Sequence, residues 1–139
     1  MFDVKRLLTD VFDPQPGEIA AVMVDLPHEG IPDTAAWIAR RAMAERWRGA
    51  LAELGAERGF EVLPLLSFPA TGANNADLPT VGWLGGSELN LGERLSSSTL
   101  VIAMTQFSAT APLSHLAKAN PDLRAASMPG VEERMEGTA

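Results

Sequence analysis

Apolar residues recur every three or four positions along two stretches of the chain, a spacing typical of amphipathic helices. The first stretch covers residues 4–12 and ends before Pro14; its apolar side chains are Val4, Leu7, Leu8, Val11 and Phe12. The second follows Asp33 and Thr34, either of which can cap a helix, and ends at Gly59. Its predicted buried stripe contains Trp37, Ala44, Trp47, Leu51 and Leu54. The face predicted to contact water carries Arg40, Glu45, Arg46, Arg48, Glu53 and Glu57.

Other stretches are apolar without a helical period, which is typical of strands covered on both faces of a parallel sheet. They read EIAAVMVD (18–25), FEVLPLLSF (60–68), TLVIAMT (99–105) and the shorter LRAASM (123–128). Pro64 cannot donate to a ladder, so the second of these strands has an edge position or a bulge there. We expect the strands at about Ile19–Val24 and Leu100–Met104 to be central.

The remaining segments complete an alternation of strands and helices. Residues 69–79 (PATGANNADLP) are rich in Gly, Asn and Pro, which predicts a loop, and residues 83–88 prolong it. Short helices are expected over 89–98, 111–120 and 129–137. This order predicts one α/β domain over residues 1–139, a three-layer α/β/α sandwich whose mostly parallel sheet is Rossmann- or flavodoxin-like.

Composition narrows the classes of function. The 139 residues carry a net charge of −7, which argues against nucleic-acid partners because phosphates are bound by clustered Lys and Arg. The chain contains no cysteine, which excludes disulfides, cysteine-ligated zinc and a thiol nucleophile and is compatible with a cytoplasmic protein. We expect no signal peptide and no membrane segment, since no eighteen-residue apolar run is present.

Ser114 and His115 form the first candidate for chemistry, because a serine beside a histidine suggests a nucleophile and its base. Neighbouring residues on a helix point about 100° apart, so the two side chains cannot readily hydrogen-bond. The sequence signals neither a third orienting residue nor an oxyanion hole, and G-x-S-x-G is absent. We therefore interpret the pair as the junction between a loop and a helix.

Asp25, His28 and Glu29 form the second candidate, because they follow the first strand and ligands of open α/β sheets bind outside the carboxyl ends of strands. Such residues could hold a metal, but only two histidines are present and neither lies in H-E-x-x-H spacing. A polar turn is the favoured interpretation. The GWLGG segment (82–86) matches no dinucleotide or phosphate-loop pattern, so no cofactor is expected in this chain.

Two segments carry a resemblance to a known family. The opening DPQPGEIAAVMVD, after the first helix, is similar to the start of aminopeptidase T-like leucyl aminopeptidases, which are dinuclear metallopeptidases. The segment TLVIAMTQFSATAPLSHLAKANPDLRAASMPG resembles a later strand, Ser/Thr-rich loop, helix and R-x-x-S-M-P-G motif of the same family. The matching positions are Ser108, Thr110, Ser114, His115, Arg124, Ser127, Met128, Pro129 and Gly130.

The resemblance implies an N-terminal domain that contributes a cavity wall and a subunit interface. In that family the metal ligands lie in a C-terminal domain with no counterpart here, so zinc, cobalt or manganese is implied only for that missing domain. A related ring-cleaving dioxygenase shares the architecture, which leaves the parent chemistry open. The expected partners are a second copy of the chain or the missing domain.

Two alternatives stay open beside this reading. The first is a free-standing small α/β module that binds a small polar ligand or peptide; the second is a small hydrolase that uses Asp25, His28 and Glu29. The candidate ligand-binding residues are Asp25, His28, Glu29, Ser108, Thr110 and His115.

Overall fold

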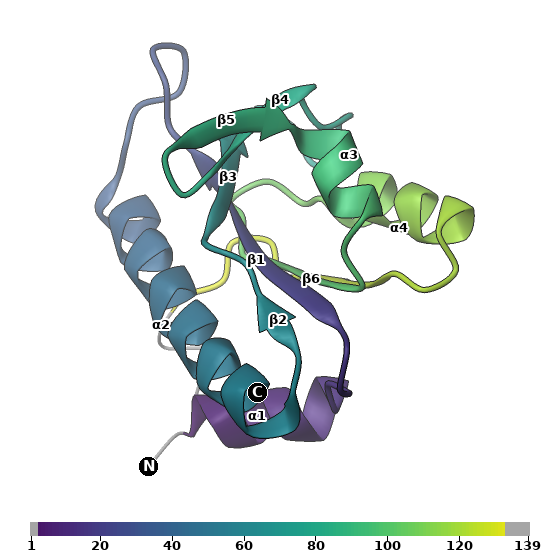
Figure 1. The fold of residues 1–139 in the computed structure, drawn as a ribbon. Helices are drawn as coiled ribbons and strands as arrows, with labels where there is room; N and C mark the ends of the chain where they lie inside the picture. The colour runs from purple at the N-terminus through teal and green to yellow at the C-terminus, as the bar shows by residue number, and fades with distance from the viewer. Residues whose placement is uncertain (1–2, 133–139) are drawn as a thin grey trace.

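Strand β1 (Ile19–Leu26) lies at the centre of a mixed, mostly parallel sheet (Figure 1). The computed structural model describes residues 3–132, and within them the sheet has seven strands. The others are β2 (Glu61–Val62), β3 (Leu66–Pro69), β4 (Val81–Leu84), β5 (Ser87–Asn90), β6 (Leu100–Ala103) and β7 (Arg124–Ser127). Their order is β5-β4-β3-β1-β6-β7, with β2 paired to the start of β1. The predicted α/β class and the central places of β1 and β6 are confirmed.

Helices form where the sequence places caps and apolar stripes. They are α1 (Val4–Phe12), α2 (Ala35–Arg58), α3 (Leu91–Ser96) and α4 (Thr110–Ala119). The Thr34 hydroxyl accepts the amide hydrogen of Trp37 and caps α2, as predicted. Gly59 ends α2 at φ 85, a left-handed conformation that glycine adopts without a steric penalty. Trp37, Trp47 and Leu51 are buried on one stripe of α2, which confirms the predicted helix phase.

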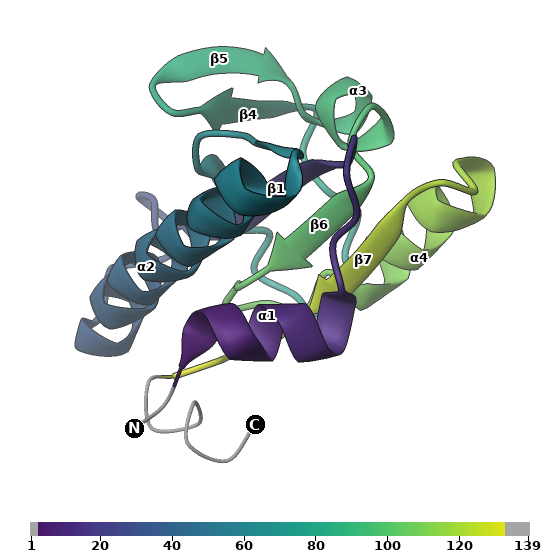
Figure 2. The same cartoon turned by 60° about the horizontal axis from the view of Figure 1, so that its bottom comes forward.

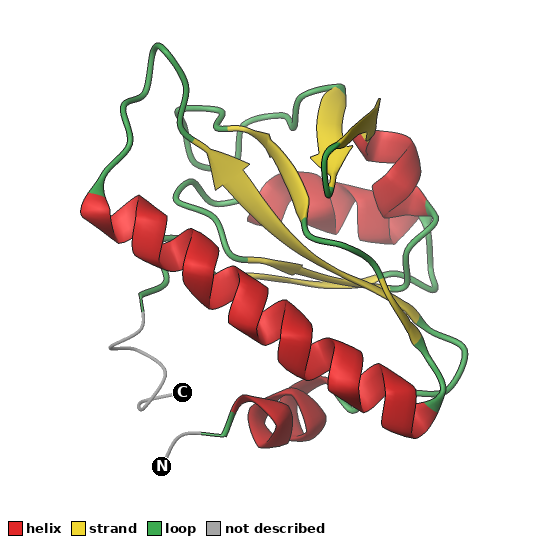
Figure 3. Cartoon of the chain, turned by 60° about the vertical axis from the view of Figure 1, so that its left-hand side comes forward, coloured by secondary structure: helices red, strands yellow, loops and turns green. Residues whose placement is uncertain are grey.

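The two faces of the sheet are covered by different helices (Figures 2 and 3). Successive side chains of a strand point to opposite faces, so β1 contributes to both hydrophobic clusters. Ala20, Val22 and Val24 pack with α1 and α2, whereas Met23 packs with α3 and α4. Burial on both sides explains why β1 and β6 are apolar at every position of their centres.

The predicted strand over 60–68 is two strands separated by a bulge. β1 advances from Ala20 to Met23 while the partner chain advances from Val62 to Leu66, so the partner side holds one extra residue. Pro64 lies in this insertion, where its missing N–H leaves no gap in the ladder. The structure shows the bulge, and the strand before it, β2, is also an edge, because within the described residues it pairs with β1 alone.

Residues 81–90 correct the predicted long loop. Strands β4 and β5 form a hairpin in which Leu84 pairs with Ser87, and Gly85 occupies the turn with φ 63. The helix predicted over 89–98 is correspondingly shorter, because Asn90 ends β5 and caps α3. The helix predicted over 129–137 is not present in its described part, because residues 129–130 form a turn and residues 131–132 are irregular; residues 133–137 lie outside the described range.

The prediction that Arg40 lies on the solvent-exposed face of α2 is wrong, because the residue is only 3% exposed. Its Nε donates to the carbonyl oxygen of Val131 at 2.9 Å, which ties the segment after β7 to the helix, while its Nη1 has no hydrogen-bond partner within residues 3–132. Burial lowers the pKa of the Arg40 guanidinium, and the nearby charges of Asp25 and Glu132 oppose that shift.

No helix among residues 3–132 is long and apolar enough to cross a bilayer.

Candidate functional site

Asp25 at the carboxyl end of β1 is buried and bound by other parts of the chain. Asp25 is 1% exposed, and its carboxylate accepts the amide hydrogens of Gln106 and Phe107 at 2.9 and 3.1 Å. The indole N–H of Trp37 donates to the same carboxylate at 3.2 Å. Trp37 and Phe107 meet edge to face with ring centroids 6.2 Å apart. Asp25 therefore joins β1, α2 and the loop after β6 and is enclosed by them.

His28 is held in the turn after β1. Its Nδ1 accepts the amide hydrogen of Gly30 at 3.2 Å, so its Nε2 carries the proton that it donates to the carbonyl oxygen of Ala70 at 3.0 Å. The backbones of His28 and Ile31 exchange two hydrogen bonds. Glu29 is exposed beside this turn. Among residues 3–132 no group of three His, Cys, Asp or Glu side chains is placed to hold a metal ion.

Ser108 and Thr110 belong to a polar clip between two loops. Their hydroxyl oxygens are 2.9 Å apart, and the amide hydrogen of Ser108 is donated to Oδ1 of Asn74 at 2.9 Å. Oδ1 of Asn75 accepts the amide hydrogen of Ala111 at 2.9 Å, which caps the start of α4 from outside the helix. Asn75 has φ 61, a left-handed conformation that asparagine tolerates better than most residues. The clip holds residues 74–75 against the start of α4.

A pocket of about 570 Å³ lies next to this clip, between residues 75–80, the start of α3 and one side of α4. Its lining consists of Asn75, Asp77, Leu78, Pro79, Thr80, Asn90, Gly92, Leu95, Ala111, Pro112, His115 and Leu116. Of the six predicted ligand-binding residues, only His115 lines this pocket. Ser114, its neighbour, does not.

The pocket contains polar side chains that the fold leaves unused. Within the described residues, no hydrogen bond or ion pair engages the side chains of Asp77, Thr80 or His115. Asn75 and Asn90 use their carbonyl oxygens to cap α4 and α3, which leaves their NH₂ groups free to donate. The pocket therefore combines one carboxylate, one imidazole, one hydroxyl and two amide donors with apolar walls.

Sequence reasoning missed the asparagines that build this site. Asn90 directly precedes α3 and caps its first turn. Asn75 caps the first turn of α4, although it lies 36 residues before Ala111 in the sequence, so only folding brings the two together. The Asn74–Asn75 pair in a Gly- and Pro-rich loop was the available signal, because asparagine favours left-handed turns and caps.

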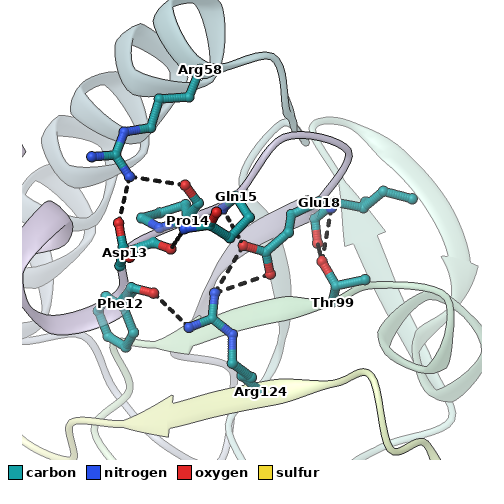
Figure 4. Close-up of polar contacts among 9 residues, drawn as sticks. Phe12, Asp13, Pro14, Gln15, Glu18, Arg58, Thr99 and Arg124 are labelled. Carbon is teal, nitrogen blue, oxygen red and sulfur yellow. Dashed lines mark hydrogen bonds and ion pairs between the residues drawn. The ribbon is translucent and has the colours of Figure 1, made fainter.

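At the opposite end of the sheet, Arg124 joins the two segments that carry the family resemblance (Figure 4). Its Nη2 donates to both carboxylate oxygens of Glu18 at 3.0 and 2.9 Å, and its Nη1 donates to the carbonyl oxygen of Phe12. Arg58 similarly binds Asp13 and the carbonyl oxygen of Pro14. Glu18 of the PGE segment and Arg124 of the RAASMPG segment thus stabilise each other in the fold.

Comparison with known proteins adds no relative. No family model matches the chain, and no curated protein and no solved structure matches it either.

Proposed function

We propose that this chain is a non-catalytic α/β binding domain that holds a small polar ligand in the pocket between residues 75–80, α3 and α4. The observation that carries the proposal is that the pocket offers the unused polar groups of Asp77, Thr80 and His115 beside apolar walls. Its volume of about 570 Å³ falls within the size range of small-molecule sites. In contrast, the carboxylate of Asp25 at the carboxyl end of β1 is buried and already accepts hydrogen bonds from Gln106 and Trp37.

The proposed architecture is a three-layer, flavodoxin-like sandwich. The parallel strands run β3-β1-β6-β7 across the sheet, which corresponds to the first four places of the doubly wound order 2-1-3-4-5. Helices α1 and α2 on one face, and α3 and α4 on the other, support this classification. The β4–β5 hairpin extends the sheet beyond that order.

Amide chemical shifts of the ¹⁵N-labelled chain during titration with small polar probes such as 2-phenylethanol and benzamide test the binding proposal. We expect shifts at residues 75–80, 90–95 and 111–116. The two histidines provide a matched pair of variants, because only one lines the pocket. His115→Ala should weaken binding several-fold, whereas His28→Ala should leave the affinity unchanged. Shifts centred on residues 25–31, or none at all, would contradict the proposal.

A second candidate function is the N-terminal, non-metal-binding domain of a leucyl aminopeptidase-like metalloenzyme, contributing a cavity wall and a subunit interface. Its support is the resemblance of the two segments, which the ion pair between Glu18 and Arg124 brings together in the fold. The same architecture is compatible with the parentage of a ring-cleaving dioxygenase. In either case the pocket would form one wall of a larger cavity.

For this second candidate we expect the chain to hydrolyse no aminoacyl amide when zinc, cobalt or manganese is added. A peptidase metal centre requires three or more protein ligands and an open coordination position, and the candidates Asp25 and His28 are held by backbone groups and Trp37. A colorimetric assay with an aminoacyl anilide and each metal checks this. Turnover that disappears in His28→Ala would instead support the small hydrolase.

A further inference from the structure

We propose that the natural ligand of the pocket is an organic ammonium ion, a small molecule with a protonated amine on an apolar body that also bears a hydrogen-bond acceptor. The inference rests on the proposed binding function and specifies its ligand class. Three properties of the lining carry it: the charge, the free donors and the apolar wall.

The charge of the lining favours a cation. Asp77 is the pocket's one carboxylate, and no Lys or Arg appears among its lining residues. The carboxylate of Asp77 has no partner of its own within residues 3–132. The whole chain adds a net charge of −7, which raises the local concentration of cations and repels anions. Phosphorylated ligands are therefore disfavoured, since phosphates are held by cationic side chains or several backbone amides.

The amide donors call for an acceptor on the ligand. Oδ1 of Asn75 is engaged by Ala111, and Oδ1 of Asn90 is engaged by Glu93, at 2.9 and 3.0 Å. Each asparagine consequently offers NH₂ donors, while its carbonyl oxygen already serves as a helix cap. A carbonyl, ether or hydroxyl oxygen on the ligand would satisfy these NH₂ groups.

Apolar side chains form the rest of the wall and require an apolar body on the ligand. Leu78, Leu95 and Leu116 line the pocket together with Pro79 and Pro112. Leu95 is fully buried and anchored in the cluster between the sheet, α3 and α4, so this part of the wall is rigid. A purely polar cation, such as a simple metal ion, would leave this surface without a partner.

Three probes that share a benzene ring and a short alkyl arm separate the charge preference from binding itself. They are 2-(4-methoxyphenyl)ethylamine, 2-(4-methoxyphenyl)ethanol and 3-(4-methoxyphenyl)propanoate, titrated into the ¹⁵N-labelled chain near neutral pH, and all three carry the same ether oxygen as acceptor. We expect the amine to bind about three-fold more tightly than the alcohol, a size typical of an ion pair with an exposed carboxylate. The carboxylate probe should bind most weakly. Molar salt should reduce the preference, because it shortens the Debye length to about 3 Å.

Asp77→Asn should abolish the preference for the amine, so that the variant binds the amine and the alcohol with equal affinity. Asp10→Asn is the matched control, since Asp10 is an exposed aspartate on α1 whose loss changes the net charge equally. Equal affinity for amine and alcohol, or a preference retained in Asp77→Asn, would overturn the inference while the binding function stands. Failure of all three probes to shift the pocket amides would overturn both.

Discussion

The ion pair between Arg124 and Glu18 should contribute a measurable coupling free energy to the stability of the fold. Bidentate pairs of this kind are stronger than single contacts, and the Glu18 side chain is only 14% exposed. We expect a coupling free energy of about 1 kcal/mol in a double-mutant cycle of Glu18→Gln and Arg124→Gln, measured by urea unfolding. The exposed pair Arg6–Asp10, at 3.8 Å, is the control and should couple by less than about 0.5 kcal/mol. Equal couplings in the two pairs would contradict the structural role assigned to Arg124.

Single residues also show where sequence reasoning reaches its limit. The caps of α2 and the fold's central strands follow from local pattern, so Thr34 and the run from Ala20 to Val24 were predictable. Arg40 was not, because its charge predicts exposure, whereas the carbonyl of Val131, 91 residues away, makes its burial possible. Asp25 and Asn75 likewise acquire their roles from partners distant in sequence.

At the scale of the element, α2 contains two glycines with opposite predicted responses to alanine. A Cβ at Gly49 would meet nothing within 4 Å, so Gly49→Ala should raise the free energy of unfolding by about 0.5–1 kcal/mol through helix propensity. A Cβ at Gly55 would lie 2.6 Å from the carbonyl oxygen of Phe60. Gly55→Ala should therefore lower the free energy of unfolding by about 1–3 kcal/mol. Urea unfolding of both variants checks this, and a stabilised Gly55→Ala would contradict the tight turn after α2.

The hairpin β4–β5 could not be predicted from the sequence. Its strands have four residues each, too short for a convincing alternation, and Gly82 interrupts the first. The reason for that glycine is tertiary, because a Cβ there would lie 2.7 Å from the carbonyl oxygen of Ser67 on the neighbouring strand. Long helices and doubly buried strands are predictable from period and length, whereas this hairpin is specified by its contact with β3.

For the whole molecule we predict a homodimer or higher oligomer. Val11, Ile38 and Val81 are the large apolar side chains exposed within the described residues, whereas Leu7, Trp83 and Leu84 are partly buried. The sequence predicts an apolar interface from Phe2, Leu7, Val11, Trp83, Leu84 and Met135, of which Phe2 and Met135 lie outside the described range. Light scattering over a concentration series should give a mass above the 14.8 kDa of one chain. A strict monomer at high concentration would contradict this and favour a free-standing binding module over a subunit interface.

The central position of β1 has a consequence for how the protein is made. Its neighbour on one side, β3, is synthesised soon after it, but its neighbour on the other, β6, pairs with residues 80 positions earlier in the chain. A ribosome that adds about 5–20 residues per second leaves that side of β1 unpaired for about 4–16 s. Throughout this interval the nascent chain presents an apolar strand with an open edge, a state prone to aggregation. Yield of the intact protein should therefore rise when chaperones cover the nascent strand until β6 emerges, and fall when synthesis is slowed.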